Sequence, residues 1–320
     1  MSYFISIIIV GLVSGSIYAL IALGYTMVYG IIELINFAHG DIFMMGTLVT
    51  ITLFKILNVN DIDPPRGLAL VGVLLLAFIV AMLACAVLGV VIELIAYRPL
   101  RNAPRLAPLI SAIGVSLILE DVGKLWYGLS PVGIPQIFPN NLLQFGGVDV
   151  HSLDIFIIVV AVVLMIALQW LVQRTRLGRA MRAVAQDHEA AALMGVNVNR
   201  IITVTFFIGA GLAGAAAVIY GLKFGNTVYY VGFSVGLFAF TAAVLGGIGN
   251  IGGAMLGGLV IGLVQAFAVL IPNSLDPSSQ GLGIPHGGAA WGPALIFAIL
   301  ILILVFRPSG LLGQNTPDKV

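Results

Sequence analysis

Long apolar runs separated by short polar segments dominate this chain. The runs occupy residues 4–29, 29–54, 68–96, 106–126, 153–172, 201–222, 233–245, a stretch that ends at 271 after the turn GGIGNIGG, and 291–306. A membrane-spanning helix needs about 20 apolar residues. The pattern therefore predicts an all-α polytopic membrane protein with about eight to ten transmembrane helices. No soluble domain fits between the runs, so residues 1–320 form a single transmembrane domain.

Polar residues interrupt the second run and predict a broken or kinked helix. A charge in the middle of the bilayer costs about 2.5–3.5 kcal/mol, so Asp41 is not expected to face lipid. Gly40 lets the backbone open toward a polar solute. The residues expected to line a substrate path are Asn36, Phe37, His39, Gly40 and Asp41. Two alternatives remain open: a structural polar network that joins two helices, and a location at a membrane surface.

Two glycine-interrupted segments suggest an internal repeat. NFAHGDIFMMGTLV lies in the first half of the chain and VLGGIGNIGGAMLGGLV in the second. Broken helices at matching positions in two halves indicate a substrate site near the membrane midplane. The alternative is that these glycines only allow close helix packing.

The distribution of charge predicts the topology. Hydrophobic residues make up 60% of the chain and charged residues 8%, against about 25% charged in soluble domains, so the outer surface must face lipid. Arginines occur in 97–105, 174–200 and the C-terminal tail, whereas 127–152 and 273–290 contain neither Lys nor Arg. The positive-inside rule then predicts a cytoplasmic C-terminus, and counting spans backwards puts the N-terminus outside. The net charge of +1 gives no reason to expect a nucleic-acid partner.

The polar segment 174–200, RTRLGRAMRAVAQDHEAAALMGVNVNR, predicts two short helices on the membrane surface. Asp187 is a suitable N-cap for a helix over 188–194, Gly195 a suitable stop, and Asn199 a suitable cap for the next span. An apolar face is predicted from Met181, Val184 and Ala185. The small-residue face at 190–192 fits a partner's groove, although an ordinary positive-inside loop is the alternative.

The remaining polar residues predict structural roles. Glu93 is expected to pair with Arg98, and Glu120 with Lys124 at the i,i+4 spacing of a helix face. Cys85 lies in an apolar run and predicts a packed thiol. The sequence contains no phosphate-binding loop, no HExxH, no GxSxG and no Cys/His cluster. We therefore expect no enzyme activity, no metal and no cofactor in this chain.

Several blocks resemble one family. Glu189-Ala190-Ala191 followed by Gly195 looks like the EAA-x-x-x-G coupling motif of bacterial ABC importer permeases. Further blocks resemble the branched-chain amino acid permeases, in particular their H-type subunit: SIYALIALGYTMVYGIIELINFAHGD, IELIAYRPLR, LISAIGVSL, GRAMRAVAQDHEAAALMGVNVNRI, FTAAVLGGIGNIGGAMLGG and RPSGLLG. The segment 272–290 departs most from that pattern.

The resemblance implies a division of labour in a multi-subunit importer of the bacterial inner membrane. Two cytoplasmic ATPase subunits would bind ATP and grip segment 174–200, a second permease of the M type would complete the pore, and a periplasmic binding protein would deliver leucine, isoleucine or valine. The residues expected to couple to the ATPases are Arg179, Arg182, Asp187, Glu189, Ala190, Ala191 and Gly195.

Two other functions remain open at this point. The same kind of machine would serve for urea, short amides or other amino acids. A stand-alone secondary transporter or channel would not need a docking segment.

Overall fold

The computed structural model describes residues 2–60, 64–101, 103–104, 106–139, 141–145, 148–271, 287–307 and 309–313. The helices are α1 Ser2–Ile32, α2 His39–Ile56, α3 Leu68–Ile92, η1 Glu93–Tyr97, η2 Arg98–Leu100, α4 Leu106–Tyr127, α5 Ser152–Arg174, α6 Arg176–Gln186, α7 His188–Leu193, α8 Val198–Phe224, α9 Val231–Gly246, α10 Ile251–Ala268 and α11 Gly287–Phe306. The strands are β1 Val132–Gly133, β2 Leu142–Phe145, β3 Val148–His151 and β4 Asn226–Thr227. The prediction of an all-α membrane protein is confirmed.

Each predicted apolar run contains a helix, and the run 29–54 is interrupted at 33–38 before α2. By length and hydropathy, six helices among the described residues suit a full membrane crossing, namely α1, α3 with its extension to Leu100, α4, α5, α8 and α10. The apolar parts of α9 and α11 are shorter, and α2 carries Asp41 in its first turn and Lys55 in its last.

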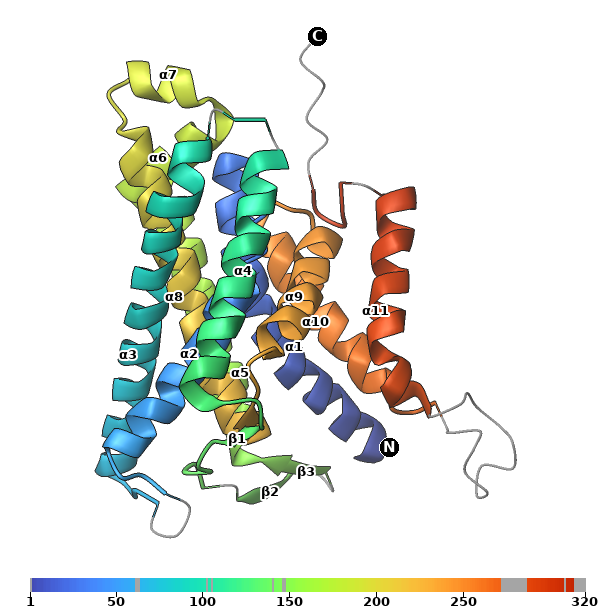
Figure 1. The fold of residues 1–320 in the computed structure, drawn as a ribbon. Helices are drawn as coiled ribbons and strands as arrows, with labels where there is room; N and C mark the ends of the chain where they lie inside the picture. Colours follow the sequence, from blue (N-terminus) through green and yellow to red (C-terminus); the bar gives the residue numbers. More distant parts are fainter. Residues whose placement is uncertain are drawn as a thin grey trace.

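The helices form an upright bundle with α6 and α7 at one end (Figure 1). The first turns of α1 lie at the opposite end, whereas the C-terminal end of α11 lies at the α7 end (Figure 1). The two ends of the described chain are therefore on opposite sides of the bundle, as the count of spans predicts. The segment 272–286 lies outside the described residues.

Small residues bring the central helices close together. A Cβ on Gly15 of α1 would lie 2.8 Å from the Leu259 Cα of α10, and one on Gly262 only 2.2 Å from the Gly15 nitrogen. With no strong hydrophobic force between helices in lipid, such close backbone packing stabilises their association. The absence of side chains at Gly15 and Gly262 therefore lets α1 and α10 pack backbone against backbone.

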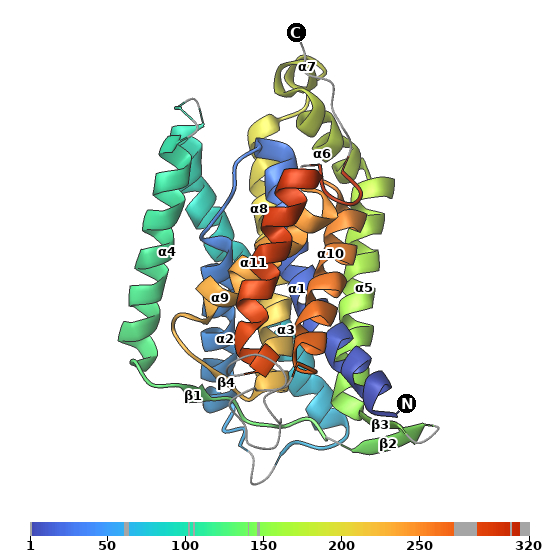
Figure 2. The same cartoon turned by 90° about the vertical axis from the view of Figure 1, so that its right-hand side faces the viewer.

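The outer helices present apolar stripes. On α3, Leu75, Ile79, Leu83 and Val87 follow one another at intervals of four residues and are all exposed. One face of a helix repeats at this spacing. α4 stands at the edge of the bundle, well away from α5 and α10 (Figure 2). The stripes are suited to lipid contact, as the composition requires.

Two interruptions of the helical chain face each other. The first, residues 33–38, connects α1 to α2; we call it the break. The second, residues 225–230, connects α8 to α9 and includes β4. The first turns of α2 and α9 touch, because a Cβ on Gly40 would lie 2.3 Å from the Gly232 carbonyl oxygen. The N-terminal ends of α2 and α9 thus meet inside the bundle.

The turn predicted at GGIGNIGG is confirmed, but this segment is not the second interruption that the repeat suggested. GGIGNIGG does not break a helix within the membrane; it forms the turn between α9 and α10. That turn lies beside the chain after α11, since the Asn250 Nδ2 donates to the Leu312 carbonyl at 2.7 Å. The Gly247 φ of 103° and the Gly249 φ of 92° explain why glycines occupy it.

Short strands close the end opposite α7. β2 and β3 form an antiparallel hairpin with Leu142 opposite His151. β1 pairs with β4, with Val132 opposite Thr227. The Thr227 hydroxyl also lies 2.8 Å from that of Thr47 in α2. The segment that the sequence predicts as a loop is therefore partly ordered as a sheet and connects to the second interruption.

Candidate functional site

The α6–α7 segment is held in shape by its caps. The Thr175 hydroxyl accepts from the Gly178 N–H at 3.0 Å at the start of α6. The Asp187 Oδ1 accepts from the N–H groups of Glu189 at 2.9 Å and Ala190 at 3.0 Å at the start of α7. Gly195, with φ of 83°, ends it. These caps confirm the predicted two-helix shape.

The next cap lies earlier than predicted. The Asn197 side chain, not that of Asn199, accepts from the Arg200 N–H at 3.0 Å and starts α8. Asn199 makes a different contact, because its Oδ1 accepts from the Arg101 Nη1 at 2.6 Å. Either Asn197 or Asn199 could cap α8 by its local sequence. The contact with Arg101 occupies the Asn199 side chain and leaves the cap to Asn197.

The α6–α7 segment presents a mixed polar and apolar surface. Arg179, Glu189 and Ala190 are exposed, whereas Ala191 is buried. The Arg182 guanidinium donates to the Val172 carbonyl at the end of α5, so it holds the segment against the bundle. Of the predicted apolar face of α6, Met181 and Val184 are buried and Ala185 is exposed.

Two large apolar side chains at the end of α7 are not among the residues predicted to couple. Leu193 is 89% exposed and Met194 is 84% exposed. They lie at the end that carries most of the arginines, where lipid tails are not expected to cover them. Single exposed apolar residues are common, but a neighbouring pair on a capped helix forms a contact surface. The signal in the sequence was an apolar pair directly before the stop at Gly195.

The break begins with a strained residue. Glu33 has φ of 52°, a left-handed conformation that costs a residue with a side chain about 1–3 kcal/mol. Its N–H donates to the Tyr29 carbonyl at 2.8 Å and closes the last turn of α1. The Tyr97 hydroxyl donates to the Asn36 Oδ1 at 3.0 Å. The backbone of the break is therefore fixed by specific contacts at both of its ends.

The predicted path residues lie in the first turn of α2 and directly before it. The His39 ring lies over the backbone of α1, 2.2 Å from where a Cβ on Gly24 would stand, and packs edge-on against Tyr25. Asp41 is 1% exposed and accepts a hydrogen bond from the Ser116 hydroxyl of α4. Three of their atoms are buried without a hydrogen-bond partner among the described residues: Asn36 Nδ2, His39 Nε2 and Asp41 Oδ1.

A cavity of about 270 Å³ lies beside these residues. Its lining is mostly aromatic and aliphatic and comes from α1, the break, α4 and α9: Tyr25, Phe37, Ile113, Ser116, Leu117, Glu120, Gly232, Phe233, Leu237 and Phe240. Of the predicted path residues, only Phe37 reaches it; Asp41 lies behind Ser116. An apolar pocket with a few polar groups is the usual form of a small-molecule site.

The acids of α4 have different partners from those predicted. Lys124 pairs with Asp121 at 2.8 Å, and Glu120 lines the cavity instead. Residues at i,i+3 and at i,i+4 both lie close on a helix face, so the predicted Glu120–Lys124 pair is replaced by Asp121–Lys124. The cavity therefore contains one carboxylate that the sequence assigned to a helix-surface ion pair.

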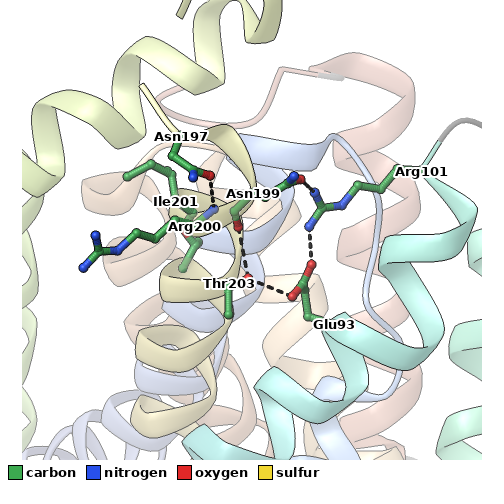
Figure 3. Close-up of polar contacts among 8 residues, drawn as sticks. Glu93, Arg101, Asn197, Asn199, Arg200, Ile201 and Thr203 are labelled. Carbon is green, nitrogen blue, oxygen red and sulfur yellow. Dashed lines mark hydrogen bonds and ion pairs between the residues drawn. The ribbon is translucent and has the colours of Figure 1, made fainter. Parts of the chain in front are cut away.

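A buried ionic cluster joins α3 to α8 near the α6–α7 segment (Figure 3). Glu93 is 0% exposed; one of its carboxylate oxygens accepts from the Arg101 guanidinium and the other from the Thr203 hydroxyl at 2.9 Å. The predicted Arg98 pairing is wrong, because the π-helical turn of η1 changes which side chains face each other. Burial lowers the pKa of the Arg101 guanidinium, and the Glu93 carboxylate opposes that shift.

No group of three or more His, Cys, Asp or Glu side chains within the described ranges has a geometry that could hold a metal. Cys85 is buried, and its thiol donates to the Ile42 carbonyl at 3.3 Å. Its packed position confirms the prediction from sequence.

Comparison with known proteins gives a consistent result over the whole chain. Residues 7–304 match the family described as branched-chain amino acid transport system / permease component. The high-affinity branched-chain amino acid transport system permease protein BraD of Pseudomonas aeruginosa is 42% identical over 314 residues, which are 97% of this chain and 96% of that protein. The permease protein LivH of Escherichia coli, described in the same words, is 39% identical over 99% of this chain and 98% of its own length.

A more distant relative is the autoinducer 2 import system permease protein LsrD of Escherichia coli, 30% identical over 66% of this chain and 62% of that protein. No solved structure matches this chain. The family match extends over nearly the entire bundle, from α1 to α11, and the relatives align along almost their full length. The chain therefore belongs to the permease components of branched-chain amino acid transport systems.

Proposed function

We propose that this chain is one membrane-spanning subunit of an ATP-driven importer of leucine, isoleucine and valine. In this function it contributes one wall of the solute path and transmits ATP-driven movement from cytoplasmic ATPase subunits. The chain itself carries out no chemical reaction. The full-length similarity to BraD and LivH supports both the class and the cargo.

The observation that carries the proposal is the α6–α7 segment. It presents the Glu189-Ala190-Ala191 and Gly195 motif on a capped pair of helices, with exposed Leu193 and Met194 beside it. A transporter that works alone has no use for such a surface. An ATPase groove that receives a short helix by its apolar face would cover it. Arg179 and Glu189 would form the polar rim, and Arg182 and Asp187 keep the segment in shape.

The cavity is suited to the proposed cargo. Its aromatic and aliphatic lining matches a branched aliphatic side chain, and Glu120 supplies the carboxylate that an α-ammonium group requires. A buried polar atom without a partner costs about 1–3 kcal/mol. Asn36, His39 and Asp41 each have one such atom, and a polar solute that passes the junction of α2 and α9 would satisfy them.

The remaining partners are inferred from the roles proposed for this chain. The cavity is open at the exposed side chains Phe233 and Leu117, where a second permease of the M type would close it. The arginine-rich end with α6 and α7 would face the cytoplasm. The strand-bearing end would face the periplasm of a bacterial inner membrane and receive the binding protein.

Reconstitution tests the proposal. The purified complex of this chain with its second permease and two ATPases is placed in liposomes, with ATP inside and the binding protein and labelled leucine outside. We expect leucine to accumulate only with ATP, and unlabelled isoleucine and valine to compete. The same liposomes with this chain alone are the control. Accumulation by the chain alone without ATP would instead identify a stand-alone transporter. Competition only by urea or short amides would identify another cargo.

A further inference from the structure

The α6–α7 segment contacts the break directly on its α1 side. The ring of His188, the first residue of α7, places its Nε2 2.8 Å from the Ile31 carbonyl oxygen. Ile31 is in the last turn of α1, two residues before Glu33 with its φ of 52°. A carbonyl in the last turn of a helix has no intrahelical donor, so the imidazole N–H supplies one. Any movement of α7 therefore displaces the last turn of α1, which leads directly into the break.

A second series of contacts reaches the other side of the break. It starts at Asn199 in the first turn of α8, which follows α7 directly. The Arg101 guanidinium bridges the Asn199 Oδ1 and the Glu93 carboxylate (Figure 3). The Thr203 hydroxyl donates to the second oxygen of Glu93. The carboxylate is fully buried and is held by both elements, so α8 cannot shift along α3 without disturbing it.

The series continues through η1 to the break. Glu93 is the first residue of this π-helical turn and Tyr97 the last. The Tyr97 ring packs on Phe206 of α8 at 5.4 Å between ring centroids, and its hydroxyl donates to the Asn36 Oδ1 at 3.0 Å. π-helical turns are rare and are often found at functional sites. Here the turn places an acid and a phenol so that one reaches α8 and the other reaches the break.

We propose that the break is a conformational switch whose two sides are held by the ATPase-docking segment, one through His188 and the other through Arg101, Glu93 and Tyr97. When the ATPases move α7, both sides of the break move together, and the first turn of α2 with Asp41 moves with them. His188, Glu93 and Tyr97 are positioning residues: they act on the path through the break. This inference rests on the proposed function, because it assumes that ATPases dock at α7.

Removal of the Tyr97 hydroxyl gives the sharpest test. Tyr97→Phe keeps the ring on Phe206 and removes only the hydroxyl, which contacts the Asn36 Oδ1 at 3.0 Å and the Ile35 carbonyl at 3.4 Å, both within the break. The matched control is Tyr127→Phe, which removes the hydroxyl that lies 2.8 Å from that of Thr52 at the far end of α4. In the reconstituted complex we expect Tyr97→Phe to hydrolyse ATP at the wild-type rate while leucine transported per ATP falls at least fivefold. Tyr127→Phe should keep the wild-type ratio.

A reporter in the break provides a readout that a purely structural role would not change. Leu34→Cys is labelled with a thiol reagent in the complex without nucleotide and in the complex trapped with ATP and vanadate. We expect the two labelling rates to differ several-fold in an otherwise wild-type chain and to become equal when Tyr97→Phe is added. A nucleotide-dependent difference that survives Tyr97→Phe would overturn the proposal.

The His188 link has its own comparison. His188→Leu removes the donor to Ile31, whereas His188→Gln keeps an N–H on a side chain of similar reach. Among complexes that still co-purify with the ATPases, the His188→Leu variant should lose coupling between ATP hydrolysis and transport. The His188→Gln variant should keep most of this coupling. Equal coupling in both variants would contradict the inference. If the wild-type complex itself shows no ATP-dependent leucine uptake, the proposed function fails. If the wild type transports and every variant keeps its ratio, only this inference fails.

Discussion

At the scale of single residues, the acids within the apolar helices differ in what surrounds them. Asp121 is exposed and paired with Lys124, Glu93 is buried and held by Arg101 and Thr203, and Glu120 lines the cavity. An intramembrane acid that faces a cavity is a candidate for solute contact. Neighbours one residue apart on α4 therefore have separate roles, because successive residues on a helix point about 100° apart.

Glu120→Gln tests the contact with the solute. The substitution keeps the size of the side chain and removes its charge, so the ammonium group of the amino acid loses a charge-assisted partner. We expect the apparent KM for transport to rise at least about tenfold, equivalent to about 1.4 kcal/mol, as measured by uptake in the reconstituted complex. Asp121→Asn, one position further on, is the control and should leave KM unchanged. Equal values for wild type and Glu120→Gln would remove Glu120 from the path.

Gly24→Ala tests the packing of α1 against the first turn of α2 and against α8. The new Cβ would stand 2.2 Å from the His39 Nε2 and 2.9 Å from the Gly209 carbonyl oxygen, so either the ring or a helix must shift. We expect a loss of about 1–3 kcal/mol in stability, seen as a lower midpoint of thermal unfolding in detergent. Gly72→Ala in α3 is the control, because nothing lies within 4 Å of its Cβ. It should be neutral or stabilise by up to about 1 kcal/mol.

At the scale of elements, short helices perform the proposed functions and long helices support them. α8 lies at the centre of the bundle, and 78% of its most apolar stretch is buried. In α5 only 22% of the corresponding stretch is buried, so this helix faces outward. α2 and α9 are shorter and meet through Gly40 and Gly232 inside the bundle. α6 and α7 stand outside it, and their capping side chains make them stable without much burial. The sources of stability therefore differ: packing for the helices inside the bundle, including α2 and α9, and side-chain caps from Thr175 and Asp187 for α6 and α7.

Leu193→Glu tests the docking surface. The side chain is 89% exposed, so the change should not affect folding of this chain. A charge in an apolar groove of a partner costs binding free energy of at least about 2 kcal/mol, as for a central interface residue. We expect the ATPase subunits to be lost on co-purification, while the second permease is retained. Leu129→Glu, an exposed position at the opposite end, is the control. Full ATPase recovery with Leu193→Glu would place the interface elsewhere.

At the scale of the whole molecule, the two ends of the bundle differ in charge. The α7 end carries Arg98, Arg101, Arg174, Arg176, Arg179, Arg182, Arg200 and Arg307, and the other end carries Lys55, Arg66, Lys124 and Lys223 among the described residues. Two of the lysines are neutralised, Lys124 by Asp121 and Lys223 by Asp154. By the positive-inside rule, this asymmetry predicts that the α7 end faces the cytoplasm.

Cysteine labelling tests this orientation. Because Cys85 is buried, the native thiol should stay silent and new cysteines can be added directly. We expect Gln186→Cys to react with a membrane-impermeant maleimide only in inside-out vesicles. Ser130→Cys at the opposite end should react only in intact spheroplasts. Both residues are exposed. The reverse pattern would invert the topology.

The sequence alone determined the features that depend on neighbouring residues. The apolar runs became helices because about 20 apolar residues in lipid must satisfy their backbone internally. Polar residues and Gly40 predicted a broken helix in the second apolar run; the structure places the break at 33–38, and Gly40 lies just after it in the first turn of α2. α7 was predicted from Asp187 and Gly195 as its start and stop. Family membership was also readable, because the motif blocks extend over nearly the whole chain.

Only the tertiary structure decided the features that depend on contacts between distant residues. Tyr97 bonds to Asn36 across 61 positions, Ser116 to Asp41 across 75, and Thr203 to Glu93 across 110. The cavity and the meeting of α2 with α9 likewise come from helix packing, in which small residues set how closely backbones approach. Hydropathy and caps describe each segment by itself, whereas these contacts depend on how the segments are placed together in space. That is why the break was predicted but its connection to the docking segment was not.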